Sequence, residues 1–254
     1  MKIVIIGTGN VATIFGNLLK KAGHHINQVF GRNPVQAALL AGQLDAQPCW
    51  EWSGVDKQAD LYFVAISDQA LVELHLHLVL SDQIIVHTAG AVSQEVLKEI
   101  SANYGVLYPL QSLKKGMPIP SQIPLLIDAN TEETKNKLLQ VGADLSNSVM
   151  IATDEQRRKY HVAAVFINNF TNHLYALAES YCRGEDIPFN LSFPLAAETA
   201  ARLQSASPAQ VVTGPAIRGD ESTIRKHLEL LHHYPVLYDM YAGFTKSIRQ
   251  WYKK

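Results

Sequence analysis

Residues 1–12, MKIVIIGTGNVA, place an apolar run directly before a glycine-rich turn. The run from Met1 to Ile6 is rich in β-branched residues and favours a strand, and the stretch IFGNLLKKAG after the turn favours a helix. A strand that passes through G-x-G-x-x-A into a helix is typical of dinucleotide-binding units. In such units Gly7 permits the tight turn, Gly9 lets a pyrophosphate approach the backbone, and Ala12 lets the helix pack closely on the strand. We therefore predict cofactor contacts along the whole turn, at Gly7, Thr8, Gly9, Asn10, Val11 and Ala12.

The second strand candidate, residues 26–30, ends in Gly31-Arg32-Asn33. Units that bind NAD usually carry an acidic residue at the position of Gly31, where it bonds the ribose 2′-OH. Arg32 instead offers a permanently charged, planar guanidinium that suits a 2′-phosphate, and Asn33 can add a hydrogen bond. This loop predicts NADP(H) rather than NAD(H), with a solvated turn residue as the alternative interpretation of Arg32.

Composition indicates a globular protein that acts on a small molecule. The chain has 254 residues, of which 47% are hydrophobic and 18% charged, enough for one large core or two smaller ones. Its 22 basic and 23 acidic residues give a net charge of −1 without a basic cluster, which argues against nucleic-acid and membrane partners. Cys49 and Cys182 lie far apart, so we expect no metal site or disulfide framework. No signal peptide or membrane span is evident, and we expect a cytoplasmic protein.

Strand and helix patterns alternate as far as residue 152. Further strands are predicted at 61–66, 83–87, 105–108, 124–127 and 148–151, and helices at 35–44, 70–80 and 131–142. This pattern predicts an α/β domain with a doubly wound parallel sheet, a Rossmann domain that binds NADP, over residues 1–152. A long helix is predicted from Thr153 to about Arg183, followed by helices at 190–205, 222–232 and 236–251. Residues 153–254 are therefore predicted to form an all-helical domain for substrate binding and dimerisation.

Ligands bind beyond the carboxyl ends of the strands in open parallel sheets, so residues that follow strands are candidate contacts. We predict cofactor contacts from Ile66, Ser67, Asp68, His87 and Thr88, and substrate contacts from Tyr108 and Gln111. Ser67 and Asp68 could equally cap a helix. His87 could be a solvated group that titrates near neutrality or a structural histidine.

Four groups of motifs resemble one known family. They are HTAGA at 87–91, YPLQS at 108–112, YHVAA at 160–164 with NNF at 168–170, and TGPAIRGD at 213–220 followed by His227-Leu228. Their order and spacing resemble predicted short-subunit dehydrogenase-like NADP oxidoreductases, which join a Rossmann-like domain to a helical domain of unknown function. The chain is more distantly similar to pyrroline-5-carboxylate reductase and to 6-phosphogluconate dehydrogenase-like proteins. The resemblance implies an NADP cofactor and a helical second domain that often dimerises. The family usually has His at the position of Tyr108 and Ser at that of Ala89.

The predicted long helix supplies the candidate catalytic residues. Residues spaced at i, i+4, i+7 and i+11 share one face of an α-helix, and His161, Val165, Asn168 and Asn172 have this spacing. Related β-hydroxyacid dehydrogenases use a lysine one turn before an asparagine, but Ala164 and Val165 occupy that place here. We predict that His161 donates a proton and Asn168 fixes the substrate, with His87 as a second candidate for the proton donor. A structural histidine at an interface is the alternative for His161.

The segment from Thr213 to Asp220 is predicted to be a loop that presents Arg218, with Asp220 capping the next helix. Arg218 could bind a substrate carboxylate or phosphate, or pair with Asp220 or a neighbouring subunit.

The sequence as a whole predicts an NADP-dependent oxidoreductase that moves a hydride between nicotinamide and a small carbonyl or imine compound. A non-catalytic NADP(H)-binding sensor or scaffold is the alternative, as is an enzyme of another class that reuses the sheet. The long helix carries more apolar residues than one face needs, which predicts a homodimer through the helical domain.

Overall fold

The computed structural model describes residues 1–252, which form two compact units. The first unit comprises Met1–Asn168, and the second begins at Asn169. The predicted order, a Rossmann-type sheet domain followed by a helical domain, is confirmed.

The first unit contains one sheet of eight strands in the order β3-β2-β1-β4-β5-β6-β7-β8. The strands are β1 (Lys2–Ile6), β2 (His25–Phe30), β3 (Gln47–Cys49), β4 (Leu61–Val64), β5 (Ile84–His87), β6 (Asn103–Pro109), β7 (Leu125–Ala129) and β8 (Val149–Ile151). All neighbours are parallel except β6 and β7, which are antiparallel. The sheet is therefore not wholly parallel as predicted, because residues 110–124 form no crossover helix and the chain turns straight back.

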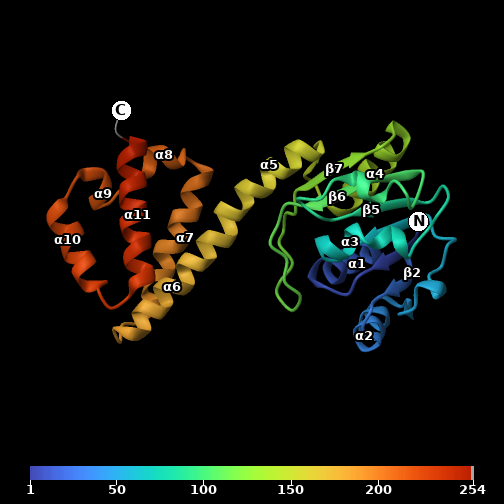
Figure 1. Cartoon of the computed structure of the whole chain (residues 1–254), viewed down its shortest axis with the longest axis horizontal. Coiled ribbons are helices and arrows are strands. Elements are labelled where there is room, and N and C mark those ends of the chain that lie inside the picture. Colours follow the sequence, from blue (N-terminus) through green and yellow to red (C-terminus); the bar gives the residue numbers. More distant parts are fainter. Residues whose placement is uncertain (253–254) are drawn as a thin grey trace. The chain divides into compact units, whose positions relative to one another are not determined.

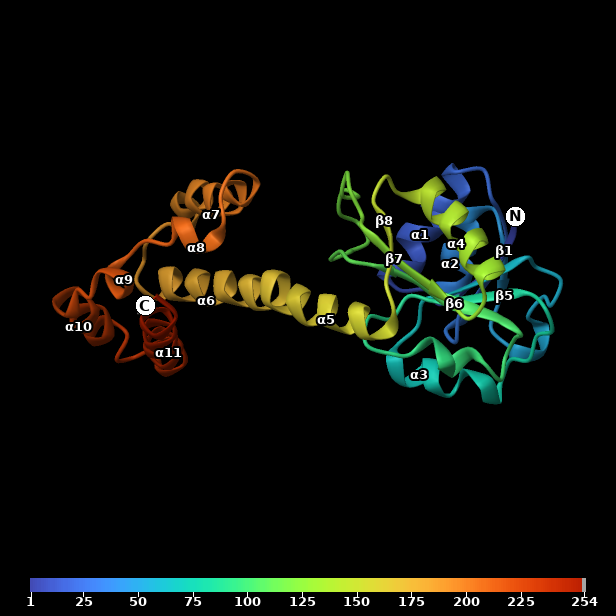
Figure 2. The same ribbon diagram turned by 90° about the horizontal axis from the view of Figure 1, so that it is seen from above.

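Helices and short turns cover both faces of this sheet. The helices are α1 (Asn10–Lys21), α2 (Pro34–Leu44), α3 (Asp68–Val72) and α4 (Glu132–Leu145), and 3-10 turns lie at Trp52–Gly54, Leu74–Leu76 and Gln94–Leu97. Ile3 and Ile5 of β1 pack with α1, α2 and α4, whereas Val4 and Ile6 face the side covered by α3. Figure 1 labels these elements, and Figure 2 shows α3 on the opposite side of the sheet from α1, α2 and α4. The burial of both faces explains why the strands are continuous apolar runs.

Two local predictions for the first unit were wrong. The helix predicted at 70–80 ends at Val72 and continues as a 3-10 turn. Leu74, Leu78 and Leu80 are all buried, and this spacing does not fit one face of an α-helix, so irregular backbone is needed to bury all three. Strand β3 was not predicted, because three residues are too few to show an alternating pattern.

The predicted long helix consists of three segments. These are α5 (Asp154–Ala164), a π-helical segment (Val165–Phe170) and α6 (Thr171–Gly184). A Thr153 capping box starts α5 just after the sheet ends. The π-helix has i to i+5 hydrogen bonds, so the α-helical spacing that placed His161 and Asn168 on one stripe does not apply across it.

The second unit is helical throughout its described part, residues 169–252. After α6 come α7 (Phe193–Ala201), α8 (Pro208–Val211), α9 (Pro215–Arg218), α10 (Glu221–Leu230) and α11 (Pro235–Tyr252), with 3-10 turns at Phe189–Ser192 and Arg202–Gln204. The helix predicted at 190–205 is thus shorter and flanked by 3-10 turns, and the predicted loop at 213–220 contains the single turn α9. Asp220 caps α10 as predicted, accepting from Thr223 N–H at 3.1 Å. Within residues 1–252, no helix has the length and apolar character needed to cross a membrane.

Candidate functional site

A cavity of about 790 Å³ opens beyond the carboxyl ends of β1, β2, β4 and β5. It brings together most of the predicted cofactor residues, since it is lined by Gly7, Thr8, Gly9, Asn10, Val11, Gly31, Arg32, Asn33, Ile66, Ser67, Asp68 and Thr88. Gln111, a predicted substrate residue, also lines it. Ala12, His87 and Tyr108 do not line it; Ala12 and His87 are fully buried.

Two glycines that line this cavity, Gly7 in the turn after β1 and Gly31 after β2, have no room for a side chain. Gly7 has a φ of +125°, and an added Cβ would lie 2.1 Å from the carbonyl oxygen of Ala65. At Gly31 a Cβ would lie 2.6 Å from Cγ2 of Thr8. No atom lies within 4 Å of the corresponding point at Gly9, so the backbone there is open to a ligand.

The beginning of α1 is free to bind an anion. Gly9 is the N-cap residue of this 12-residue helix and provides no side-chain cap. Within the described residues, the backbone N–H groups of Asn10 and Val11 have no hydrogen-bond partner, as expected for the first turn of a helix. Exposed N–H donors and the positive end of the helix dipole fit the pyrophosphate of a dinucleotide.

Arg32 and Asn33 lie at the end of β2. Arg32 is exposed and forms no ion pair within residues 1–252, so its guanidinium is available to a ligand. The side-chain oxygen of Asn33 caps α2, accepting from two backbone N–H groups at 3.0 and 3.1 Å. Its amide nitrogen is the part left for a ligand.

An aromatic wall of Phe30, Trp52 and His77 also lines the cavity. Trp52 stacks on Phe30 with ring centroids 3.8 Å apart, and on His77 with centroids 5.4 Å apart and planes at 2°. This wall was not predicted, because Trp52 follows the unpredicted β3 and His77 follows the unpredicted early end of α3.

Several predicted contacts also serve the local fold. Ser67 caps α3, accepting from Ala70 N–H at 3.4 Å, so the two interpretations of Ser67 are compatible. Thr88 donates its hydroxyl to the carbonyl of Val64 at 3.3 Å. The side-chain oxygen of Asn10 accepts from a backbone N–H at 3.1 Å, which leaves its amide nitrogen for a ligand.

His87 is not a solvated residue, and that alternative was wrong. It is 0% exposed at the end of β5, and its Nδ1 accepts from the Ala89 N–H at 3.1 Å. Burial, and then the positive charge of Arg157, lower the pKa of His87 to about 4. His87 is therefore neutral at neutral pH. Arg157 is itself fully buried; it pairs with Asp154 at 2.7 Å and donates to the carbonyl of Val92.

His161 lies beside Tyr108 rather than alone on the helix. Tyr108 Oη and His161 Nδ1 are 3.0 Å apart, although 53 residues separate them in the chain. An added Cβ at Gly90, which lines the cavity, would lie 2.6 Å from His161 Nδ1 and 3.0 Å from Tyr108 Cε2. The pair thus packs directly against the cavity wall. Asn168 is exposed in the π-helical segment.

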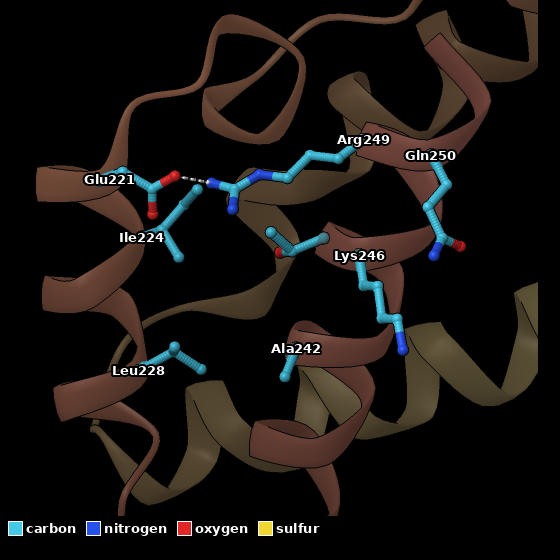
Figure 3. A pocket seen from close by; sticks show the side chains of 8 residues that line it. Glu221, Ile224, Leu228, Ala242, Lys246, Arg249 and Gln250 are labelled. Atoms are coloured by element: carbon cyan, nitrogen blue, oxygen red, sulfur yellow. Dashed lines mark ion pairs between the residues drawn. The ribbon is translucent and has the colours of Figure 1, made fainter. Parts of the chain in front are cut away.

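The second unit has a separate cavity of about 430 Å³ between α10 and α11 (Figure 3). Two of the side chains that line it, Glu221 and Arg249, form an ion pair with Glu221 Oε1 and Arg249 Nη2 2.6 Å apart. The same two residues line a neighbouring cavity of about 280 Å³, to which Arg218 also contributes. Arg218 forms no ion pair with Asp220 in the described part of the chain, because the Asp220 carboxylate accepts from Ser222 and Thr223 instead.

No metal centre is evident in the described residues, which contain no group of three or more His, Cys, Asp or Glu side chains placed to hold an ion. The candidate site is thus the cavity of the first unit, with the Tyr108–His161 pair at its wall.

Known proteins share both parts of this chain. Residues 1–111 match the Rossmann-like domain, and residues 123–248 match the domain of unknown function DUF2520. A protein from Bacteroides fragilis, whose assignment as an NADP oxidoreductase is itself inferred, is 36% identical over 98% of both chains, with a TM-score of 0.90. No curated protein sequence matches the chain.

More distant structures share the fold. An imine reductase from Myxococcus stipitatus, in complex with NADP⁺, is 16% identical, with 98% of this chain and 93% of that chain covered and a TM-score of 0.68. A 1-pyrroline-5-carboxylate reductase from Streptococcus pyogenes is 18% identical over 98% of both chains, with a TM-score of 0.66.

Proposed function

Because this chain belongs to the family that joins a Rossmann-like domain to a DUF2520 domain, we propose that it is an NADP(H)-dependent oxidoreductase acting on a small carbonyl or imine compound. The observation that carries the proposal is the cavity of the first unit, where an uncapped helix N-terminus and an unpaired Arg32 line the same space. The name of the Bacteroides fragilis relative supports an NADP oxidoreductase, and those of the imine reductase and the 1-pyrroline-5-carboxylate reductase support reduction of an imine.

The residues present fit NADP(H). Gly9 and the first N–H groups of α1 would hold the pyrophosphate, and Arg32 would bind the 2′-phosphate as a charged, planar donor. The flat wall formed by Phe30 and Trp52 suits the adenine ring, because aromatic rings stack favourably on one another. The bound cofactor would supply the hydride, and the protein would orient it and manage the proton.

His161 is the proposed proton donor. It lies against Gly90 at the cavity wall and is partly exposed, whereas His87 is fully enclosed and neutral at neutral pH. A general acid must come within hydrogen-bond reach of the reacting atom, which favours the group at the wall. Asn168 is proposed to contact the substrate.

Calorimetry with NADPH and NADH tests the cofactor assignment. We expect NADPH to bind more tightly by about 1.5 to 3 kcal/mol, the range for hydrogen bonds to charged groups. Arg32→Ala should remove most of this preference, because no other arginine lines the cavity. Arg158→Ala, at an exposed position outside the cavity, is the matched control and should retain it. Equal affinities for both cofactors in the unmutated protein would contradict the assignment.

Turnover distinguishes an enzyme from a sensor. NADPH oxidation should proceed with at least one member of a panel of cyclic imines, keto acids and ketones. On that substrate His161→Gln should lower turnover by about 10²- to 10⁴-fold and leave NADPH affinity unchanged, because His161 lies outside the cofactor residues. Tight NADPH binding without turnover on any member would favour the sensor.

We also propose a homodimer through the second unit. Among its described residues only Ile224 and Thr245 are buried, while Leu191, Leu195 and Trp251 are 76%, 70% and 74% exposed. A unit of this size needs a core to be stable, and large exposed apolar side chains mark an interaction surface. A second copy with two-fold symmetry would supply the missing contacts.

Light scattering at micromolar concentration tests the dimer. The unmutated chain should have twice the chain mass, and Leu195→Glu should shift it toward the monomer because it buries a charge in the interface. Lys98→Glu adds a negative side chain at an exposed position of the first unit and should leave the mass unchanged. A monomeric mass for the unmutated chain would contradict the proposal.

A further inference from the structure

The Tyr108–His161 contact has two possible directions. Either the phenol donates to Nδ1, or a protonated Nδ1 donates to the phenol oxygen, and the 3.0 Å separation fits both. The choice decides which ring nitrogen of His161 carries the proton, because a neutral imidazole has one donor and one acceptor nitrogen.

Burial of Tyr108 decides between the two directions. Tyr108 is only 8% exposed, and His161 Nδ1 is the only hydrogen-bond partner of its hydroxyl within residues 1–252. If Nδ1 were the donor, the O–H of this largely buried side chain would have no acceptor within residues 1–252, which is unfavourable. If the phenol donates, both groups are satisfied and the proton of His161 sits on Nε2.

We propose that Tyr108 is a positioning residue that holds His161 with its proton on Nε2 and keeps the ring neutral, by donating its own proton to Nδ1, while Nε2 gives its proton to the substrate. The proposal rests on the reductase function proposed above. As the double bond of the substrate is reduced, its oxygen or nitrogen takes the proton from Nε2, and Nδ1 takes the proton of Tyr108 Oη. Nε2 then takes a proton from water, which leaves as hydroxide, and Nδ1 returns its proton to the phenolate, so both groups regain their starting state.

Two features around Tyr108 act on its proton in opposite directions. Burial raises the pKa of Tyr108, so the phenol keeps its proton at neutral pH and is present as the hydrogen-bond donor. The positive charge of the buried Arg157 acts in the opposite direction and stabilises the transient phenolate. Arg157 lies one turn before His161 on α5, so the same helix carries both groups.

Gly90 allows the two rings to meet. With an added Cβ only 2.6 Å from His161 Nδ1 and 3.0 Å from Tyr108 Cε2, any side chain at this position would push the rings apart. Gly90→Ala therefore weakens the hydrogen bond while both ionisable groups remain in the chain.

Nitrogen NMR of ¹⁵N-histidine-labelled protein tests the proposal. The spectrum is recorded at about pH 8, where an ordinary histidine with a pKa of about 6.5 is neutral. The signals of His161 are identified by their loss in His161→Gln. We expect the Nε2–H form to dominate in the unmutated protein. Tyr108→Phe should lower the ratio of the Nε2–H to the Nδ1–H form by about tenfold, which corresponds to about 1.4 kcal/mol.

Two further variants separate the hydrogen bond from general effects on the fold. Tyr160→Phe removes the hydroxyl of the residue next to His161 on α5 and should leave the ratio unchanged. Within residues 1–252 that hydroxyl makes only one hydrogen bond, a 4.0 Å contact with Met150 Sδ. Gly90→Ala should lower the ratio as Tyr108→Phe does. An Nδ1–H form in the unmutated protein, or an unchanged ratio in Tyr108→Phe, would overturn the proposal. Absence of NADPH binding would instead overturn the proposed function, because the tautomer is measured without cofactor.

Discussion

Acid should destabilise the first unit through His87. This side chain is fully buried, and its pKa is lowered to about 4, first by burial and then by the charge of Arg157. In the unfolded chain the same ring has a pKa of about 6.5. Between these two values the unfolded state binds more protons than the folded state, so stability falls as the pH decreases.

The expected loss follows from the two pKa values. At 1.36 kcal/mol per pKa unit, the titration of His87 alone removes about 3 kcal/mol of unfolding free energy between pH 7 and pH 4. This loss is a large part of the unfolding free energy of a typical folded domain, which is about 5 to 15 kcal/mol. His87→Gln keeps an acceptor for the Ala89 N–H but cannot titrate, so this part of the acid sensitivity should disappear.

Urea unfolding at several pH values, followed by circular dichroism, measures the effect. The unmutated protein should lose about 3 kcal/mol more than His87→Gln between pH 7 and pH 4. His25→Gln, which replaces an exposed histidine of β2, is the control and should keep the unmutated pH dependence. Parallel pH profiles for the unmutated protein and His87→Gln would show that His87 is solvated or charged in the folded state, and the reasoning would fail.

Three further substitutions test the turn and the buried ion pair. Gly7→Ala should lower the free energy of unfolding by about 1 to 3 kcal/mol, because the added Cβ would lie 2.1 Å from a backbone oxygen at a φ of +125°. Gly9→Ala should leave stability nearly unchanged but weaken NADPH binding by about tenfold in calorimetry, about the loss of one hydrogen bond; unchanged affinity would place the pyrophosphate elsewhere. Asp154→Asn should cost about 3 to 5 kcal/mol in urea unfolding, because the buried Arg157 loses its counter-charge. Glu155→Gln, in an exposed pair, should have no measurable effect, and equal losses in both variants would count against a buried pair.

The cofactor side of the site could be predicted because its signals are local. Strand, turn and helix follow one another within residues 1–21, and Arg32 directly follows the next strand. The steric demands of Gly7 and Gly31 belong to the same short segments, although the atoms they approach come from elsewhere in the chain. The sequence therefore indicated which residues would line this cavity before any contact was known.

The chemistry of the histidines could not be predicted in the same way. The lowered pKa of His87 depends on its burial and on the charge of Arg157, a residue 70 positions further along the chain. The Tyr108–His161 contact spans 53 positions. The aromatic wall depends on Trp52, and a pattern of alternating strands and helices does not predict which residues this side chain contacts. Such contacts arise from tertiary packing, and hydrophobic periodicity carries no information about them.

The π-helical segment explains why an α-helical spacing does not describe the arrangement of His161 and Asn168. A stripe drawn at 100° per residue assumes unbroken α-helix, but Val165–Phe170 has a wider turn. No proline or glycine interrupts residues 153–183, so no residue in this segment indicated that the helix type would change.

The tight packing at Gly90 has a consequence for how this site can vary between relatives. Because two aromatic rings from β6 and α5 occupy the space beside its Cα, position 90 cannot gain a side chain without separating the rings of Tyr108 and His161. A relative with a larger residue at 90 should therefore carry a smaller residue at 108 or 161. These three positions should covary across the family although they lie in three separate segments, and a relative that keeps both rings should keep the glycine.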